Sequence, residues 1–338
     1  MKFRALSILS LCAAIASPAA HAQSFYAGKQ IVLVAGSAPG GGYDLLARLM
    51  TRHLGKHIEG APTFVVQNMP AAGSLTATNL LFNTAPRDGT TIGIIQRGML
   101  LARLTSPAQA QFDLGKFNWL GSMNSETAVT LANAATPHVT AKDLFEKELI
   151  VGSEINVDPE TTARLYNDLL GTKFKIVNGY NGTTEIGLAM ERGEVQGVAD
   201  WSWSSLLVQH PEWLRDKKVR VLLQGSLIPN KDLPDVPTAL SFVKGDIEKR
   251  TLELYFTQKT VARPVLAPPG VPADRIEILR KGFAALAGDK EFLADAEKSK
   301  LEINLLDGAG VDRVISLITS ATPDVRDRYV KAATGQGK

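Results

Sequence analysis

Three loops rich in glycine and alanine hold the residues with the clearest chemical potential, and the first spans residues 38–44 (APGGGYD). Its glycines let a ligand approach the backbone, and the free N–H groups at the start of a following helix favour an anion. The loop lacks the Lys-Ser/Thr pair of a phosphate-binding P-loop, and Leu45 replaces the third glycine of a dinucleotide motif. A carboxylate is therefore the expected anion, and a tight turn without a ligand is the alternative.

Two later loops offer similar donors. Residues 68–74 (NMPAAGS) again expose backbone N–H groups, and the hydroxyl of Ser74 or Thr76 can donate to a ligand or cap the next helix. Residues 178–184 (NGYNGTT) would suit an oxygen-rich ligand. Taken alone, each of these two loops is more often a helix cap than a binding site.

Residues 200–203 (DWSW) could add an aromatic surface. In an extended segment, alternation places Trp201 and Trp203 on one face and Asp200 with Ser202 on the other. The indoles either pack in a core, or one of them forms the wall of a ligand pocket by stacking.

Catalytic chemistry finds little support in the sequence. A GxSxG nucleophile elbow is absent, and Cys12 is the only cysteine. His53 and His57 stand four residues apart, but Leu54 occupies the place of the glutamate in a zinc-binding HExxH motif. We therefore expect two solvated histidines, no catalytic residue, no metal site and no enzymatic activity.

The elements that must position these loops alternate between strands and helices, which is typical of βαβ units and of mainly parallel sheets. Apolar, β-branched runs predict strands over residues 29–36, 63–66, 91–95, 149–151, 174–177 and 219–223. Apolar residues at helical spacing and cap signals predict helices over 44–54, from 158, over 185–192, around 276–286 and after Asp289. The pattern indicates two α/β lobes, with a boundary near 118–126.

Composition agrees with a globular chain. Of its 338 residues, 45% are hydrophobic and 21% are charged, and 37 basic against 34 acidic side chains leave a formal charge of +3. This balance argues against a nucleic-acid binder. A single cysteine excludes an intramolecular disulfide and a cysteine-rich zinc site.

The N-terminus predicts a secretory signal peptide over residues 1–22. Lys2 and Arg4 precede an apolar run over 5–16, and residues 20–22 (AHA) match the small-x-small cleavage pattern, with cleavage after Ala22. A membrane-spanning helix is the alternative, but the run is shorter than the roughly 20 apolar residues that a span needs. No later stretch is long and apolar enough to span a bilayer. We expect an exported, periplasmic protein that does not insert into the membrane.

Taken in order, these loops resemble the pattern of the substrate-binding receptors of tripartite tricarboxylate transporters, the Bug family. The segments that carry the resemblance cover nearly the whole exported chain: 39–44 with Ala47-Arg48, 68–73, 85–91, 180–183, 193–197, 233–238 and 266–272. The resemblance implies a type II periplasmic-binding-protein fold, with two α/β lobes and a ligand cleft between them. Lobe I would comprise residues 23–126 and 257–338, and lobe II residues 127–256.

The resemblance also implies a function. Receptors of this family close around a small carboxylate and deliver it to a permease that has one large and one small membrane subunit and is driven by an ion gradient. They act as monomers without a cofactor. Two alternatives stay open: a ligand-sensing receptor for a sensor kinase, and an exported hydrolase or lyase on the same frame.

The expected ligand contacts lie in loops of both lobes, and Trp201 is added as a candidate cleft wall. In lobe I they are Ser37, Pro39, Gly40, Gly41, Gly42, Tyr43, Ala71, Ala72, Gly73 and Ser74. In lobe II they are Gly152, Ser153, Tyr180, Asn181, Gly182, Thr183 and Asp200. Three positions depart from the family pattern, since Tyr43 replaces a common Thr, and Ala71 and Ser74 replace Gly. The added aromatic surface keeps an aromatic or longer aliphatic acid open beside a di- or tricarboxylate.

Overall fold

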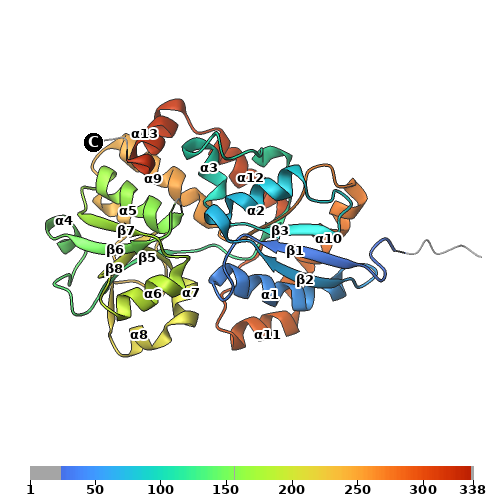
Figure 1. Cartoon of the computed structure of the whole chain (residues 1–338), viewed down its shortest axis with the longest axis horizontal. Coiled ribbons are helices and arrows are strands. Elements are labelled where there is room, and N and C mark those ends of the chain that lie inside the picture. The colour runs from blue at the N-terminus through green and yellow to red at the C-terminus, as the bar shows by residue number, and fades with distance from the viewer. Residues whose placement is uncertain (1–23, 156, 336–338) are drawn as a thin grey trace, which may run out of the picture.

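A computed structural model of the chain describes residues 24–155 and 157–335. The expected signal peptide and its cleavage site after Ala22 lie outside these residues. The chain forms two lobes, each built on its own sheet. In Figure 1, lobe I combines the blue and cyan N-terminal part with orange and red C-terminal elements, and lobe II is mainly green and yellow.

The sheet of lobe I is mixed. Its strand order is β11 (Leu306–Asp307), β4 (Asn118–Ser122), β10 (Pro264–Ala267), β3 (Thr91–Ile94), β1 (Gln30–Ala35) and β2 (Thr63–Asn68). Strand β1 pairs in parallel with β2 and β3, whereas β10 is antiparallel to both β3 and β4.

The sheet of lobe II repeats this plan. Its strand order is β7 (Phe174–Asn178), β6 (Leu149–Ser153), β8 (Gly197–Ser202), β5 (Ala128–Asn133) and β9 (Val219–Gly225). Strand β6 is parallel to β7 and β8, and β5 is antiparallel to β8 and β9. The expectation of mainly parallel sheets is wrong for β5 and β10. Both strands follow a crossing between the lobes instead of a βα unit, so they enter their sheets in the opposite direction.

Helices cover both faces of each sheet (Figure 1). They are α1 (Gly42–Leu54), α2 (Leu75–Asn83), α3 (Met99–Thr105), α4 (Asp143–Glu146), α5 (Asp158–Leu169), α6 (Thr183–Glu191), α7 (Trp203–Gln209), α8 (Pro211–Arg215), α9 (Asp246–Thr257), α10 (Ala273–Ala285), α11 (Lys290–Lys298), α12 (Gly308–Thr319) and α13 (Pro323–Thr334). None of the helices in the described ranges is both long and apolar enough to cross a lipid bilayer.

The apolar run of β1 explains how lobe I packs. Ile31, Leu33 and Ala35 point to one face of the sheet, where they meet buried side chains of α1, α10 and α11. Val34 points to the other face, toward buried side chains of α2, α3 and α12. A central strand covered on both faces needs apolar residues at every position, which accounts for the continuous run.

The C-terminal helix α13 joins the two lobes. It contacts α9 and α5 of lobe II as well as α3 of lobe I, and the Tyr329 ring stacks on Tyr255 with centroids 6.3 Å apart. In Figure 1 it lies at the top, above α5 and α9. The expected division assigns residues 257–338 to lobe I, and this helix packs mainly against lobe II.

Two chain segments cross side by side between the lobes. One runs from β4 to β5 and the other from α9 to β10. Three backbone hydrogen bonds join them: Met123 N to Arg263 O at 3.1 Å, Ala262 N to Asn124 O at 3.1 Å and Glu126 N to Lys259 O at 2.9 Å. This paired connection links the two lobes.

Candidate ligand-binding site

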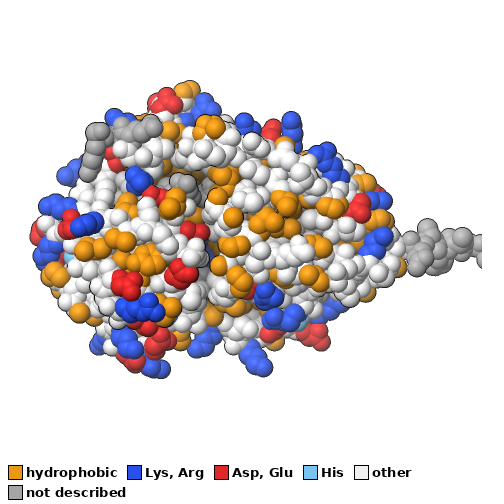
Figure 2. All heavy atoms as spheres, in the orientation of Figure 1, with side chains coloured by type: hydrophobic (Ala, Val, Ile, Leu, Met, Phe, Trp, Pro, Cys, Tyr) orange, Lys and Arg blue, Asp and Glu red, His pale blue; other side chains and the backbone are white. Residues whose placement is uncertain are grey.

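A cleft of about 300 Å³ lies between the lobes. Lobe I contributes the loop from Ser37 to Tyr43 together with Gln96 and Arg97. Lobe II contributes Glu154 and further residues of α5, α6 and β8, namely Val157, Asp158, Pro159, Asn181, Gly182, Thr183, Thr184, Glu185, Ile186, Asp200 and Ser202. Figure 2 shows the surface hollowed where the lobes meet, with acidic side chains beside the hollow.

The topology dictates this position. The loops after β1, β3, β6 and β7 each leave the carboxyl end of a strand and lead into a helix. In a parallel βα arrangement these ends share one edge of the sheet, and ligands bind there. The two lobes turn these edges toward each other, so the N-termini of α1, α5 and α6 meet around the cleft.

Asp44 fixes the glycine loop of lobe I from inside. Its carboxylate accepts hydrogen bonds from the Gly40 N–H at 2.9 Å, from Arg48 at 3.0 Å and from Asn68 at 2.8 Å. Burial works against its ionisation, but these donors outweigh burial and lower the pKa of Asp44. The Gly40 N–H group is therefore used inside the loop by its hydrogen bond to Asp44. The first N–H groups of α1, in contrast, have no partner inside the helix.

Ser37 and Tyr43 are the side chains that this loop offers to a ligand. The Ser37 hydroxyl is buried and has no hydrogen-bond partner among the described residues. The Tyr43 ring lies under the Arg263 guanidinium at 4.2 Å, and its hydroxyl accepts the Arg97 N–H at 3.0 Å. Tyr43 is thus the aromatic wall of the cleft.

A network of four charges closes the floor of the cleft, and three of them are buried while Asp158 is half-buried. Arg97 pairs with Asp158 at 2.5 Å and with Asp200 at 3.4 Å, and it donates to the Ser202 hydroxyl at 3.2 Å. Lys259 pairs with Asp200 at 2.7 Å and with Asp158 at 3.7 Å. Arg97 belongs to lobe I, Lys259 to a crossing segment and both carboxylates to lobe II, so the network connects the two lobes.

Asp200 is the centre of this network. Its carboxylate also accepts the Thr162 hydroxyl at 2.7 Å. Burial opposes its ionisation, but Lys259 and Arg97 outweigh burial and lower the pKa of Asp200. It therefore stays ionised inside the protein, and its charge is fully used by its neighbours.

Glu154 is in the opposite situation. It lines the cleft at the end of β6, and its carboxylate has no hydrogen-bond or ion-pair partner in the described ranges. Burial, followed by the nearby charges of Glu185 and Asp158, raises its pKa to about 7. This is a carboxyl group placed among other acids without a cation.

The structure brings many of the expected contact residues together. Those that line the cleft are Ser37, Pro39, Gly41, Gly42, Tyr43, Asn181, Gly182, Thr183 and Asp200. Ala71, Ala72 and Gly73 line an adjoining cavity of about 380 Å³ with Tyr180, and this cavity shares Glu154 and Asn181 with the cleft.

Three expected contact residues, Ser74, Gly152 and Ser153, do not line the cleft, and their contacts are with neighbouring parts of the protein. The buried Ser74 hydroxyl accepts the Gln96 N–H at 3.1 Å. Gly152 lies at the end of β6 against Ile186, Val195 and Tyr180, where a Cβ atom would be crowded. The buried Ser153 hydroxyl donates to the Glu154 carbonyl at 3.1 Å.

Trp201 does not line the cleft. It is fully buried in the core of lobe II, 5.6 Å from Trp213 and 5.5 Å from His210 between ring centroids. Trp203 is buried in the same cluster. The expected alternation is confirmed for the strand, since Asp200 and Ser202 line the cleft. Both indoles pack in the core of lobe II, so neither is a wall of the cleft.

Sequence reasoning missed Arg97, Glu154, Asp158 and Lys259 as site residues. The sequence places Asp158 at the start of a helix, which the structure confirms, but it does not predict that the Asp158 carboxylate binds Arg97. A signal existed for Arg97, because residues 96–98 follow a strand and precede a helix as the glycine loops do. Lys259 carried no such signal, since it reaches the site from a crossing segment.

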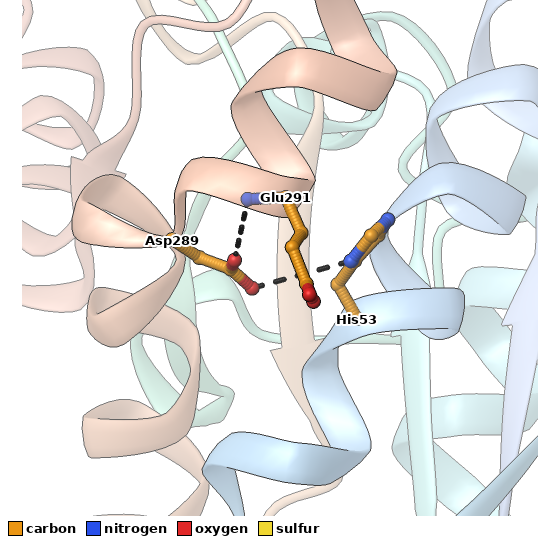
Figure 3. Close-up of side chains that lie close together, drawn as sticks. All are labelled: His53, Asp289 and Glu291. Atoms are coloured by element: carbon orange, nitrogen blue, oxygen red, sulfur yellow. Dashed lines mark hydrogen bonds and ion pairs between the residues drawn. The ribbon is translucent and has the colours of Figure 1, made fainter.

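Two groups of side chains among the described residues lie close enough together to hold a metal ion, both outside the cleft: His53, Asp289 and Glu291 (Figure 3), and Glu191, His210 and Glu212. The first group shows why neither His53 nor His57 is free. The Lys56 ammonium lies 2.9 Å from Asp289 and 2.5 Å from Glu291, so a cation already serves both carboxylates. His57 approaches Asp289 at 2.8 Å. His53, which approaches Asp295 at 3.0 Å, and His57 are therefore hydrogen-bond partners that tie α1 and the residues after it to α11, and the expectation of a solvated pair is wrong.

Comparison with known proteins places the fold. No protein-family model and no curated protein matches the chain. Among solved structures, a Rhodopseudomonas palustris protein solved with adipate shares 19% identity at a TM-score of 0.71, over 91% of this chain and 98% of that one. The periplasmic binding protein BugD shares 19% at 0.70, over 91% and 98%. MatC of R. palustris, solved with malate, shares 19% at 0.64, over 90% and 99%.

The chain has the fold of periplasmic binding proteins. The expected two-lobed α/β binding-protein fold is thereby confirmed. The cleft lined by Ser37, Tyr43 and Asp200 lies between the two lobes of this fold.

We predict that Trp201→Ala lowers the free energy of unfolding by about 3–5 kcal/mol, the usual cost of truncating a buried tryptophan. Urea unfolding measures the loss, and the dissociation constant of a bound carboxylate should change little. Weakened binding with intact stability would show instead that the indole reaches the ligand.

The raised pKa of Glu154 predicts a pH-dependent stability. Because the folded pKa of about 7 exceeds the usual 4.5, the folded protein holds a proton that the unfolded chain releases, and stability falls as pH rises between these values. Glu154→Gln removes this loss, so its melting temperature should exceed that of the wild type increasingly from about pH 5 to about pH 7. A constant difference across this range would contradict the assignment.

Asp289 both caps α11 and joins the ion pairs to α1. Its side chain accepts the Glu291 and Phe292 N–H groups, which asparagine can also do. We predict that Asp289→Ala lowers the free energy of unfolding by about 1 kcal/mol more than Asp289→Asn, since only alanine loses the cap. Urea unfolding of both variants tests this. A rise in the wild-type melting temperature with Zn²⁺, absent in Asp289→Ala, would make the cluster a metal site after all.

Proposed function

We propose that this protein is an extracytoplasmic solute-binding receptor of the tripartite tricarboxylate transporter type, which captures a small carboxylate between its lobes. The observation that carries the proposal is the cleft itself. It is lined from lobe I by glycine-rich backbone and the unpartnered Ser37 hydroxyl, and from lobe II by the start of α6. Unpaired N–H groups and hydroxyls are the donors that a buried carboxylate requires.

Closure of the lobes is the proposed mechanism of capture. Gly42 lies so close to Ser205 of α7 that a Cβ atom would overlap it, and Arg97 reaches Asp158 and Asp200 across the cleft. A ligand that contacts both lobes favours this arrangement by its higher affinity for the closed state. The hydrogen-bonded crossing segments provide the hinge.

Delivery to a permease completes the proposal. The sequence pattern of residues 39–44, 68–73 and 266–272 resembles that of receptors whose permease has a large and a small membrane subunit. The solved structures with adipate and malate, which share the fold, support small carboxylates as the cargo. The signal-like N-terminus supports a periplasmic location, and the receptor would release its ligand unchanged.

A thermal-shift screen tests the carboxylate. The exported protein is refolded to remove bound ligand and mixed with mono-, di- and tricarboxylates, both aliphatic and aromatic. Ligand at about 1,000 times its dissociation constant should stabilise the fold by about 4 kcal/mol, which raises the melting temperature by several degrees. Absence of a shift with every carboxylate, on folded protein, would contradict the proposal.

Gly41→Val tests the loop of lobe I. The backbone of Gly41 is extended, and a Cβ atom there meets only the Ala38 carbonyl oxygen at 3.5 Å, so the fold tolerates the change. The valine methyl groups would occupy the anion position, and we expect the dissociation constant to rise at least about tenfold, or about 1.4 kcal/mol.

Gly115→Val is the matched control for this change. A Cβ atom at Gly115 also meets one oxygen at 3.5 Å, that of Asp113, and the residue is exposed and away from the cleft. Titration calorimetry of both variants should separate them, and equal affinities would remove the loop from the site.

A further inference from the structure

We propose that the ligand carries a cationic nitrogen as well as its carboxylate, with the nitrogen held by Glu154 of lobe II and the carboxylate by the 37–43 loop of lobe I. The inference rests on the proposed receptor function and names the class of its ligand: a zwitterionic amino or ammonium acid. It is carried by the charges that line the cleft.

The positive charges at the cleft are already committed. Arg97 is the only basic residue among the described lining residues, and it pairs with Asp158 and Asp200. Lys259 supports the same two carboxylates from behind. Two cations and two anions neutralise each other, so the network offers no free charge to a second carboxylate of the ligand.

Two acidic side chains remain beyond this neutral network. Glu185 is exposed and accepts hydrogen bonds from the Asn181 backbone and side chain at 2.9–3.1 Å. Glu154 is half-buried, and its carboxylate has no partner in the part of the chain that the structure describes. The cleft therefore has a surplus of negative charge, and its unmatched member is Glu154.

The groups around Glu154 leave a place for a cation. The charges that act on it are those of Glu185 of α6 and Asp158 of α5. Asp200 of β8 and Arg97 of lobe I line the same cleft but are paired with each other. Tyr180 also lies beside Glu154, in the adjoining cavity. An ionised carboxylate desolvated among other acids is costly, which its raised pKa reflects. A ligand ammonium at this position would remove that cost.

The lobe I side of the cleft suits an anion. The Ser37 hydroxyl is buried and unpartnered among the described residues, and Gly42 and Tyr43, at the N-terminus of α1, line the same cleft. Ser37 and Glu154 thus line the cleft from different lobes. A zwitterion would thus bind one lobe by each of its charges, and the attraction at both ends would favour closure.

A dicarboxylate could occupy the same cleft only if Glu154 were protonated, because its second carboxylate would otherwise face Glu154, Glu185 and Asp158. The two ligand classes therefore differ in the sign of their pH dependence. A cation binds the ionised carboxylate and gains affinity as pH rises, whereas a dicarboxylate loses affinity.

The experiment compares ligands of matched chain length by titration calorimetry: γ-aminobutyrate against glutarate, and ε-aminocaproate against pimelate. We expect the amino member of a pair to bind at least about tenfold tighter. Its affinity should rise about tenfold from about pH 6 to about pH 8, as Glu154 ionises. Glu154→Gln should remove this pH dependence and reduce the preference within each pair.

Glu148→Gln is the matched control, since Glu148 is an exposed residue of lobe II outside the cleft, and it should behave as the wild type. Tighter binding of the dicarboxylate, with affinity that falls as pH rises, would overturn the inference and leave the receptor function intact. Absence of binding by every carboxylate of either class would instead overturn the proposed function. The wild-type pH profile decides between the ligand classes even if Glu154→Gln folds poorly.

Discussion

Four paired charges at the junction of the lobes, three of them buried, are the constraint on which the rest of the molecule depends. Arg97, Asp158, Asp200 and Lys259 have all lost most of their contact with water, and each is stable there only beside the others. Removing one partner from such a group leaves an uncompensated charge, which typically costs several kcal/mol. Because the four come from two lobes and a crossing segment, the requirement that they meet also fixes how the lobes face each other.

Every charge of this network is paired with another charge of the same network. These ion pairs hold the floor of the cleft in place, but they leave no unpaired guanidinium that could bind the carboxylate of a ligand. In the proposed receptor, recognition therefore falls to neutral donors on lobe I and to Glu154, the one lining carboxylate that the described residues leave without a partner. Under this proposal, the arrangement of the lobes and the choice of ligand are set by different residues, so ligand specificity can change without disturbing the junction.

The sequence predicted the architecture better than the site. Strands such as β1 and helices such as α1 follow from local patterns, and the loops at their junctions follow from βα order. The antiparallel direction of β5 and β10 could not be predicted from the sequence, because it depends on where the chain crosses between the lobes. Lys259 shows the same limit, since no local pattern places a lysine from the crossing segment beside Asp200. Trp201 shows the reverse error, since a conspicuous residue type proved to be core.

The position of β10 sets an order in which the chain can complete its parts. This strand lies in the middle of the lobe I sheet, between β3 and β4, yet it is made only after all of lobe II. Until it arrives, the sheet of lobe I lacks an interior strand and its apolar faces cannot close. The five strands of lobe II are contiguous in sequence, so their sheet does not depend on a strand from a later part of the chain. When the chain becomes available for folding from its N-terminus onward, the sheet of lobe II can therefore form early. The sheet of lobe I stays incomplete until β10, near residue 267, is also available.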